Sequence, residues 1–363
     1  MITTYTIDAK KLEENYNLFC KWGDVYFPVK TNHNKLILNK LKKLGCGFEC
    51  DSISHISKVY SKKGANKIMY SNVAKSYDDI LWAIKHNISF YTIDDDKTLA
   101  TIISLSKKYK VKKLKINVRI NVFDIFREEF ISKNVVDSRL GASVKTCKHL
   151  LNIINSEKEI AIKKGISFYV QAEIHNNEDI LKTVFEYLTN NFSLLDKLDW
   201  INIGGGSSIS RLNKSNESMK AHMRVLGIDK IILEPGRYLV DEVEDVYIPV
   251  KRMVDSDLNG GETIVSLDIG IYHGLIDIIL HKRKFNIGYI KEDNFIKLNE
   301  YNSGKKLVIR GPTADSLDVI GIFNMPDDLV NKDTVFVIKN IGAYFEVTRS
   351  RFSGEVPVRF VLK

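Results

Sequence analysis

Three groups of residues in this sequence could do chemistry, and each directly follows a short apolar run. Lys30 ends the run in FPVKTN, the glycines Gly204–Gly206 end the run in WINIGGG, and Glu234 and Arg237 enclose the Pro-Gly turn of LEPGRY. A lysine that leaves a buried strand is partly desolvated and can attack a carbonyl carbon to form a Schiff base. Bare glycine amides can approach phosphate oxygens. Taken singly, the same residues could also be a solvated lysine, a flexible turn and a surface ion pair.

The elements that would position these residues alternate regularly between strands and helices. Eight short runs rich in β-branched or aromatic residues are separated by amphipathic helical patterns, for example Lys35–Leu44, Ile53–Lys63 and Tyr77–Lys85. This alternation is typical of a closed (β/α)8 barrel of the TIM type or of a large doubly wound sheet. The eight runs are Val25–Val29, Gly47–Cys50, Lys67–Ser71, Phe90–Asp94, Leu114–Ile120, Ser167–Ile174, Trp200–Ile203 and Lys230–Leu233.

The pattern changes after about Val240. Short strand-like runs broken by Gly, Asn, Asp and Pro follow one another, and long helical stretches are nearly absent there. The runs are DVYIPVKRMV, GETIVSLDIG, KKLVIRG, DTVFVIKN, YFEVTRSRF and VPVRFVLK. We therefore expect an α/β barrel over residues 12–238 and a β-sandwich or β-barrel domain over 239–363, with residues 1–11 and the opening strand Ile2–Ile7 paired into the second domain.

A closed barrel would bring the three groups to one opening. Chemistry in such barrels sits at the C-terminal ends of the strands, and phosphate is commonly bound after strand seven. Strand eight lies beside strand one in a closed barrel, so Glu234 and Lys30 would face a common mouth. An amine, a carboxylate, an arginine and a glycine loop around one opening suit a phosphorylated aldehyde, and this predicts pyridoxal 5′-phosphate (PLP) as the cofactor.

Ordered motifs along nearly the whole chain resemble those of the fold-type III PLP-dependent decarboxylases, which include ornithine/arginine, diaminopimelate and carboxynorspermidine decarboxylases. FPVKTN resembles the PLP-lysine motif, and INIGGG and LEPGRY resemble the phosphate loop and the pyridine-nitrogen motif. GPTADSLD and IGAY resemble motifs of the family's β domain. The remaining resemblances are GFECDS, YSNVAKS, NVRIN with Arg119, and DSRLG with Arg139. The resemblance implies an alanine racemase-like barrel followed by a β domain.

The resemblance also implies roles for individual residues. Lys30 would carry the cofactor, Glu234 would contact the pyridine nitrogen, and Tyr169 would stack on the ring in place of the family's histidine. The phosphate would be bound by Gly205, Gly206, Gly236, Arg237 and Tyr344. Asp315 would act in catalysis and grip a distal amine of the substrate, and the other substrate-binding candidates are Arg139, Glu173 and Asp277.

Four positions depart from the family's pattern. Ala314 replaces the catalytic cysteine, Tyr169 replaces the stacking histidine, and Ala172 replaces a phosphate-contacting serine. Asp277 falls where diaminopimelate enzymes carry an arginine, which argues against diaminopimelate as the substrate. The missing cysteine leaves the proton donor open between a water, Lys30 and a histidine such as His281.

The main hypothesis is PLP-dependent decarboxylation of an amino acid at Cα. The substrate would be a diamino acid or a carboxylated aminopropyl or polyamine-like intermediate, in polyamine, siderophore or peptide-antibiotic biosynthesis. Two alternatives stay open: an alanine racemase-like amino-acid racemase, which GPTADSLD disfavours, and a catalytically inactive decarboxylase-like regulatory or binding protein, which retention of Lys30 and Glu234 disfavours.

Composition limits the remaining possibilities. The chain has 363 residues with 44% hydrophobic and 27% charged residues, which is typical of a globular protein with a large core. A formal net charge of +9 need not indicate nucleic acid, because the cofactor phosphate and a carboxylated substrate are anions. We expect no membrane span, no metal, four free cysteines in a reducing cytoplasm, and the homodimer with shared active sites that the resemblance implies.

Overall fold

The computed structural model describes residues 2–127, 139–170, 180–257, 261–326 and 333–363. Its backbone contacts divide the chain into two compact units. The barrel unit consists of Asn15–Lys30 and Leu41–Tyr238, and the sheet unit consists of Met1–Glu14, Thr31–Lys40 and Leu239–Lys363. The domain bounds expected from the sequence stay predictions beside this division.

Eight parallel strands close on themselves in the barrel unit, which confirms the expected (β/α)8 barrel. Closure is made by the first and last strands, where Asp24 pairs with Ile232 and Val25 with Leu233. The strands are β2 (Asp24–Pro28), β3 (Gly47–Cys50), β4 (Ile68–Tyr70), β5 (Phe90–Ile93), β6 (Lys113–Arg119), β7 (Ala161–Ser167), β8 (Trp200–Asn202) and β9 (Ile231–Leu233).

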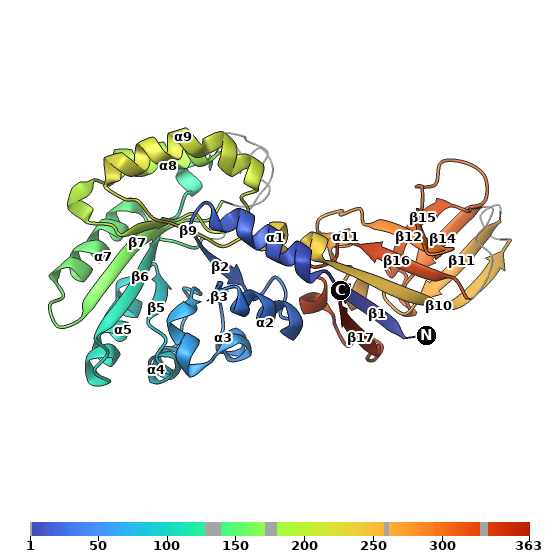
Figure 1. Cartoon of the computed structure of the whole chain (residues 1–363), viewed down its shortest axis with the longest axis horizontal. Helices are drawn as coiled ribbons and strands as arrows, with labels where there is room; N and C mark the ends of the chain where they lie inside the picture. The colour runs from blue at the N-terminus through green and yellow to red at the C-terminus, as the bar shows by residue number, and fades with distance from the viewer. Residues whose placement is uncertain (1, 128–138, 171–179, 258–260, 327–332) are drawn as a thin grey trace. The chain divides into compact units, whose positions relative to one another are not determined.

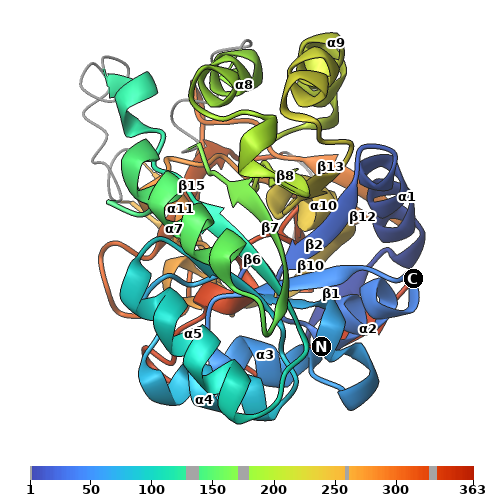
Figure 2. The ribbon, with the colours of Figure 1, turned by 90° about the vertical axis from the view of Figure 1, so that its left-hand side faces the viewer.

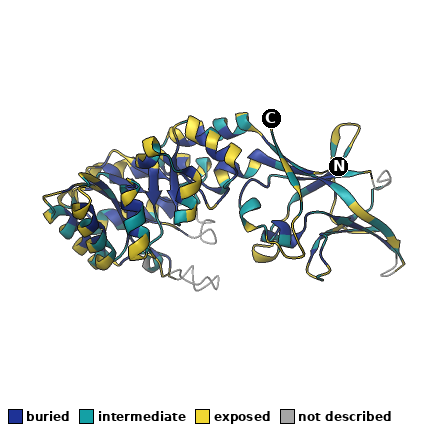
Figure 3. Cartoon of the chain, turned by 90° about the horizontal axis from the view of Figure 1, so that it is seen from below, coloured by how far each residue is buried: buried dark blue, intermediate teal, exposed yellow. Residues whose placement is uncertain are grey.

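Helices cover the outside of the barrel, where α4 packs beside α5 and α8 beside α9 (Figures 1 and 2). The strands are buried while the outer faces of the helices are exposed (Figure 3). By the division given above, helices α1, α2 and α10 are shared between the two units in sequence. The bounds of the helices up to the end of the barrel are α1 (Ala9–Cys20), α2 (Lys35–Lys43), α3 (Ile53–Val59), α4 (Tyr77–Lys85), α5 (Asp96–Lys108), α7 (Val144–Ser156), α8 (Ile180–Asn191), α9 (Ile209–Leu226) and α10 (Arg237–Val240).

Local sequence signals fix where these helices begin. Ser52, Ser76, Asp95, Ser143 and Ser208 are N-caps whose side-chain oxygens accept from backbone N–H groups in the first turns of α3, α4, α5, α7 and α9. Such caps satisfy donors that a helix start otherwise leaves unpaired. Each cap therefore sets the length of the loop between a barrel strand and its helix, and these loops carry the candidate site.

Polar groups fill part of the barrel interior. The ring nitrogen of Trp200 donates to the amide oxygen of Asn117 over 2.6 Å, and Asn117 donates to Thr92 Oγ1 over 3.2 Å. Trp200 packs with Tyr26, Met69, Phe90 and Ile232 in a buried cluster. This hydrogen-bonded amide and the buried cluster form a packed core in the barrel interior.

A nine-stranded mixed sheet forms most of the sheet unit. The long strand β10 pairs with β16 through its first half and with β11 through its second, and the register shifts between Val250 and Arg252. The N-terminal strand β1 pairs with β10 and β17, as the sequence predicted. The strands are β1 (Thr3–Ile7), β10 (Glu244–Ser256), β11 (Glu262–Leu267), β12 (Asn286–Lys291), β13 (Asn294–Lys297), β14 (Lys306–Arg310), β15 (Val319–Asn324), β16 (Val335–Lys339) and β17 (Val358–Leu362), with one short helix, α11 (Asp277–Leu280).

Some expected strands were wrong. In the run expected at Ser167–Ile174, Ser167 is the last residue of β7 (Ala161–Ser167), and Phe168 and Val170 follow it as buried residues outside any strand. The rest of that run, 171–174, lies outside the described residues. The run YFEVTRSRF is not a strand, because Tyr344 has φ +64° and a 3-10 turn covers Glu346–Thr348. The hairpin of β12 and β13 was missed because its turn uses Glu292 and Asp293 in left-handed conformations instead of the usual Asn-Gly.

Candidate active site

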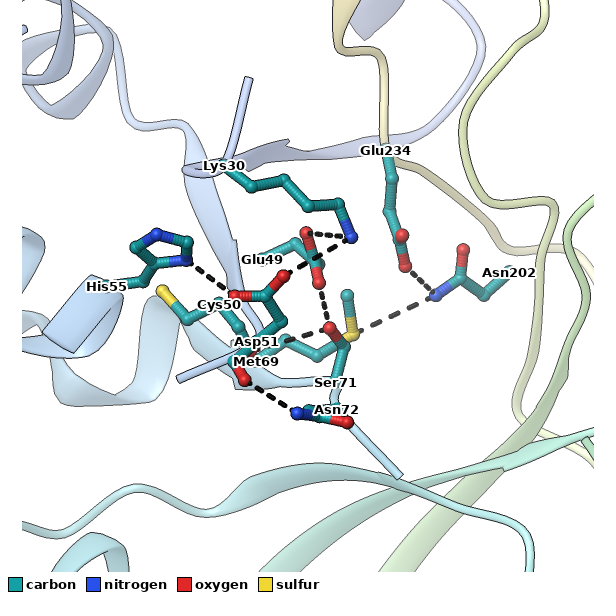
Figure 4. A network of polar contacts seen from close by, with 10 residues as sticks. All are labelled: Lys30, Glu49, Cys50, Asp51, His55, Met69, Ser71, Asn72, Asn202 and Glu234. Atoms are coloured by element: carbon teal, nitrogen blue, oxygen red, sulfur yellow. Dashed lines mark hydrogen bonds and ion pairs between the residues drawn. The ribbon is translucent and has the colours of Figure 1, made fainter. Parts of the chain in front are cut away.

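Lys30 leaves the barrel at the C-terminal end of β2. All residues of β2 after Asp24 are buried, and the N–H of Val29 donates to the carbonyl of Glu49 over 3.0 Å. The Lys30 side chain itself is 48% exposed, and its Nζ lies 3.7 Å from Glu49 Oε2 and 3.8 Å from Asp51 Oδ2 (Figure 4). The amine therefore stands at the end of a rigid strand between two carboxylates.

Glu49 and Asp51 both come from the end of β3. Alternate residues of a strand point to the same side, which explains why both reach Lys30. The Glu49 carboxylate is almost fully buried and accepts a hydrogen bond from the Ser71 hydroxyl. Burial raises the pKa of Glu49, and the nearby Lys30 charge opposes that rise. The GFECDS segment contains both carboxylates, but the motif alone did not assign a role to either.

Glu234 follows β9 and is held by residues of the neighbouring strand β8 and of the loop that follows β8. The side chain of Asn202 donates to the Glu234 carboxylate over 2.7 Å, and the N–H of Glu234 donates to the carbonyl of Gly204 over 2.9 Å. Enclosure by neighbouring atoms raises the pKa of Glu234, while the Asn202 hydrogen bond and then the charges of Lys30 and Arg119 lower it. Lys30 and Glu234 therefore act electrostatically on one another within the barrel unit.

The glycine loop after β8 requires its glycines. Gly204 has φ +63°, and a Cβ there would lie 2.6 Å from the carbonyl oxygen of Phe168. A Cβ on Gly205 would lie 2.8 Å from the carbonyl oxygen of Glu234, and Gly206 has φ +82°. The loop leads into α9, whose N-cap is Ser208. Glycine amides before a helix start form a setting in which proteins bind phosphate.

The remaining candidates of the barrel unit lie in its loops. Gly236 is buried in the turn after β9, and Arg237 begins α10. Tyr169 is 42% exposed, and its Cα would be 3.6 Å from a Cβ on Gly204, so it lies beside the glycine loop. Arg139 is exposed with φ +57°, just before Gly141. Glu173 lies outside the described residues.

Three candidates lie in the sheet unit. Asp277 begins α11, is buried, and has a carboxylate oxygen 3.7 Å from a guanidinium nitrogen of Arg283. Tyr344 donates its N–H to the carbonyl of Thr31 over 2.8 Å. Asp315 lies in the loop between β14 and β15, and its carboxylate accepts from the N–H of Leu317 over 2.8 Å.

The loop that carries Asp315 is built around Asp318. The Asp318 carboxylate is completely buried and accepts from the N–H of Ile271 and from both the N–H and the hydroxyl of Thr313, at 2.7, 3.0 and 2.7 Å. A Cβ on Gly311 would lie 2.4 Å from its oxygens. These contacts show that Gly311, Thr313 and Asp318 of the GPTADSLD motif shape the loop. The sequence alone did not distinguish residues that shape the loop from residues that act on a substrate.

The residues at the barrel mouth fit PLP. An exposed amine on a rigid strand can capture an aldehyde. The Glu234 carboxylate, which follows the strand paired with β2, acts electrostatically on that amine. The glycine loop has no room for side chains at Gly204 and Gly205. Within the described residues no cluster of three or more His, Cys, Asp or Glu is arranged to hold a metal ion. Of the helices that the structure describes, none is long and apolar enough to cross a membrane.

A closed barrel with these groups at its mouth defines a PLP-binding barrel enzyme. Residues 9–241 match the model of the pyridoxal-dependent decarboxylase family, pyridoxal binding domain. The chain belongs to this family, and it is a PLP-dependent amino-acid decarboxylase of fold type III.

Known proteins agree with this assignment. Ornithine decarboxylase of Saccharomyces cerevisiae is 24% identical over 94% of this chain and 79% of its own length. Diaminopimelate decarboxylase of Campylobacter jejuni is 23% identical over 89% of this chain and 79% of its own. The crystal structure of Paramecium bursaria Chlorella virus arginine decarboxylase bound to agmatine has a TM-score of 0.79 at 20% identity, covering 100% of this chain and 96% of the other. The structural likeness confirms the fold.

Proposed function

We propose that this decarboxylase removes the α-carboxyl group of a diamino acid, or of a carboxylated aminopropyl or polyamine-like compound, in polyamine, siderophore or peptide-antibiotic biosynthesis. The observation that carries the proposal is the placement of the Lys30 amine and the Glu234 carboxylate at the ends of the two strands that close the barrel. The similar proteins act on ornithine, diaminopimelate and arginine according to their names, and each of these substrates has a charged group at its far end.

PLP, when bound, supplies the sink for the electron pair that the departing carboxylate leaves behind. In the proposal, Lys30 binds the cofactor aldehyde, and Glu234 holds a proton at the ring nitrogen because a neighbouring carboxylate favours the charged form of a base. Asn202 fixes the Glu234 carboxylate by the hydrogen bond described above. Tyr169 stacks on the ring.

Further residues bind the phosphate and the substrate in the proposal. Gly205, Gly206, Gly236, Arg237 and Tyr344 contact the phosphate, where amide and guanidinium donors are the groups that bind it best. Asp315 accepts from the distal amine of the substrate, with Arg139, Glu173 and Asp277 as further substrate contacts.

Carbon dioxide release from a panel of amino acids tests the function. The panel contains ornithine, lysine, arginine, diaminopimelate and carboxyalkyl diamines, and we expect release from at least one of them, with diaminopimelate poor. Lys30→Ala abolishes both the release and the visible absorbance of bound PLP, while Lys58→Ala, which removes an exposed lysine of α3, keeps both. Racemisation without carbon dioxide release, or no absorbance under saturating PLP, would contradict the proposal.

We further propose a homodimer whose subunits complete one another's sites. Mixing separately inactive Lys30→Ala and Asp315→Ala chains tests this idea. If Asp315 serves the partner's Lys30, mixed dimers contain one intact site, and random exchange restores about a quarter of wild-type activity. If both residues serve the same subunit's site, each subunit of a mixed dimer lacks one of the two residues, and mixing restores no activity. A mixture of Lys30→Ala with the Lys30→Ala/Asp315→Ala double variant stays inactive in either case and serves as the baseline.

A further inference from the structure

Asp51 contacts two groups, each through a different oxygen of its carboxylate. One oxygen lies 3.8 Å from Lys30 Nζ, and the other lies 2.6 Å from Nδ1 of His55 (Figure 4). The Asp51 side chain is 31% exposed and the His55 side chain 20% exposed. A chain of three side chains thus runs from the amine at the barrel mouth to a partly accessible imidazole.

The start of α3 holds this chain in place. Ser52 is the N-cap of α3, and its hydroxyl oxygen accepts from the N–H of His55 over 3.1 Å. The cap places His55 in the first turn of α3, so that its ring lies over Asp51, four positions back and directly before the N-cap. On the other side, the amide of Asn72 donates to the carbonyl of Asp51 over 3.0 Å. Asp51 is therefore held through both its backbone and its side chain.

Asp51 differs from the other carboxylates around Lys30 in the direction of its pKa shift. The His55 hydrogen bond, followed by the Lys30 charge, keeps the pKa of Asp51 below its usual range. Glu49 on the same strand and Glu234 after β9 have pKa values raised by burial. Cys50 on β3, Tyr70 on β4 and Arg119 at the end of β6 are further titratable or charged groups that interact with members of this cluster. Of these three carboxylates, Asp51 is therefore the one whose surroundings favour the ionised form.

We propose that Asp51 is a positioning residue for the Lys30 amine, and that His55 acts on the amine only through Asp51. This inference rests on the proposed role of Lys30 as the group that captures the cofactor. An amine attacks a carbonyl only in its neutral form, whereas an adjacent carboxylate favours the ammonium. The Asp51–His55 pair therefore sets both where the amine points and what fraction of it is ready to react.

Competitive acetylation of Lys30 measures that fraction without any turnover. The full chain, freed of PLP, is treated with a trace of acetic anhydride at pH values from 7 to 10, and the labelling of Lys30 relative to the exposed Lys10 is read by mass spectrometry. Asp51→Asn should increase Lys30 labelling at pH 8 by about three- to tenfold. The reason is that an opposite charge at this distance raises the pKa of an amine by about one unit, and its removal increases the neutral fraction accordingly. A misfolded variant would change the labelling of many lysines together.

The role of His55 is tested by comparing the effect of His55→Ala on Lys30 labelling in the wild-type chain and in Asp51→Asn. His55→Ala should increase Lys30 labelling less than Asp51→Asn does, since the carboxylate stays but is no longer held toward the amine. In an Asp51→Asn background, His55→Ala should add nothing. His55→Asn should restore wild-type labelling, because its amide can donate where Nδ1 did. Asp78→Asn, the same change at an exposed residue of α4, is the matched control and should leave labelling unchanged.

Two results would overturn the inference. Unchanged Lys30 labelling in Asp51→Asn would remove the role of Asp51, and an equal effect of His55→Ala with and without Asp51 would show that His55 acts independently. Neither result depends on cofactor capture, so failure of this inference is distinguishable from failure of the proposed function, which would show as absent PLP absorbance in the wild-type chain.

Discussion

The side-chain amide of Asn202 donates to the Glu234 carboxylate over 2.7 Å, while its amide oxygen accepts from the N–H of Gly204 over 2.9 Å. One buried amide therefore holds the carboxylate proposed for the ring nitrogen and the first glycine of the loop proposed for the phosphate. A second contact to the same amide nitrogen comes from the Met69 sulfur at 3.8 Å. The two parts of the proposed cofactor site are thus fixed relative to one another by a single residue.

Replacing Asn202 should shift the acidic side of the activity profile. The Asn202 hydrogen bond is the largest influence that lowers the pKa of Glu234, so Asn202→Ala lets burial raise that pKa further. We expect the acidic limb of kcat/KM against pH to move to higher pH, with a loss of about 10- to 100-fold near neutrality. Measured profiles for wild type and variant test this. A uniform loss at every pH would mean that Asn202 only stabilises the fold.

Glu244 should make the free energy of unfolding depend on pH. Burial and the charge of Glu346 raise the pKa of Glu244 to about 8, although Asn32 donates to its carboxylate over 2.9 Å. The folded state then keeps a proton that the unfolded state has released, so its stability falls as pH rises from about 4.5 through 8, by at most about 1.4 kcal/mol per pH unit. Glu244→Gln does not titrate. Its advantage over wild type in urea unfolding should therefore grow from pH 5 to pH 8, and a constant difference would contradict the shift.

Substitution of Asp318 should lower the stability of the fold, whereas substitution of Asp315 should weaken substrate binding. Asp318→Asn replaces one of the two oxygens that accept from three buried donors by an NH2 group, so at least one buried donor loses its acceptor. An unpaired buried donor costs about 1–3 kcal/mol, and the variant should therefore unfold at a lower temperature than wild type. Asp315→Asn, three residues away in the same loop, should leave the thermal midpoint nearly unchanged and raise KM for a basic substrate. Calorimetry and steady-state kinetics on both variants distinguish the two. Equal destabilisation by both would show that Asp315 is part of the loop's framework.

Gly165 should not tolerate a side chain. A Cβ there would lie 2.3 Å from the Trp200 ring and 2.4 Å from the Trp200 carbonyl oxygen. Since backbone cannot move aside cheaply in a closed barrel, Gly165→Ala should reduce the free energy of unfolding by about 1–3 kcal/mol or more. Chemical denaturation measures it. Gly45→Ala is the comparison: nothing lies within 4 Å of its Cβ, so its cost comes only from φ +88°.

Hydrophobic periodicity predicted much of the fold because the apolar residues of each segment mark the side that is buried. Runs such as Gly47–Cys50 are apolar or buried throughout, and Tyr77–Lys85 carries both a helical pattern and the Ser76 capping signal. The errors fall where tertiary contacts override the local pattern. Strand β7 contains Lys163 and Lys164, which a sequence pattern disfavours, yet it pairs with β6 over seven residues. Phe168 and Val170, which follow it, are buried without being part of a strand.

The alternating hydrophobic periods of the sequence by themselves indicated either a (β/α)8 barrel or a large doubly wound sheet, with a separate β domain after it. The motifs in order along the chain, through their resemblance to the family, favoured the barrel. Only the tertiary structure decided which side chains meet. The reach of Glu49 and Asp51 to Lys30, the bond from Asn202 to Glu234 and the buried position of Asp318 depend on strand register and loop length. A contact between residues distant in the chain exists only once closure and packing fix both backbones, and no local pattern encodes that.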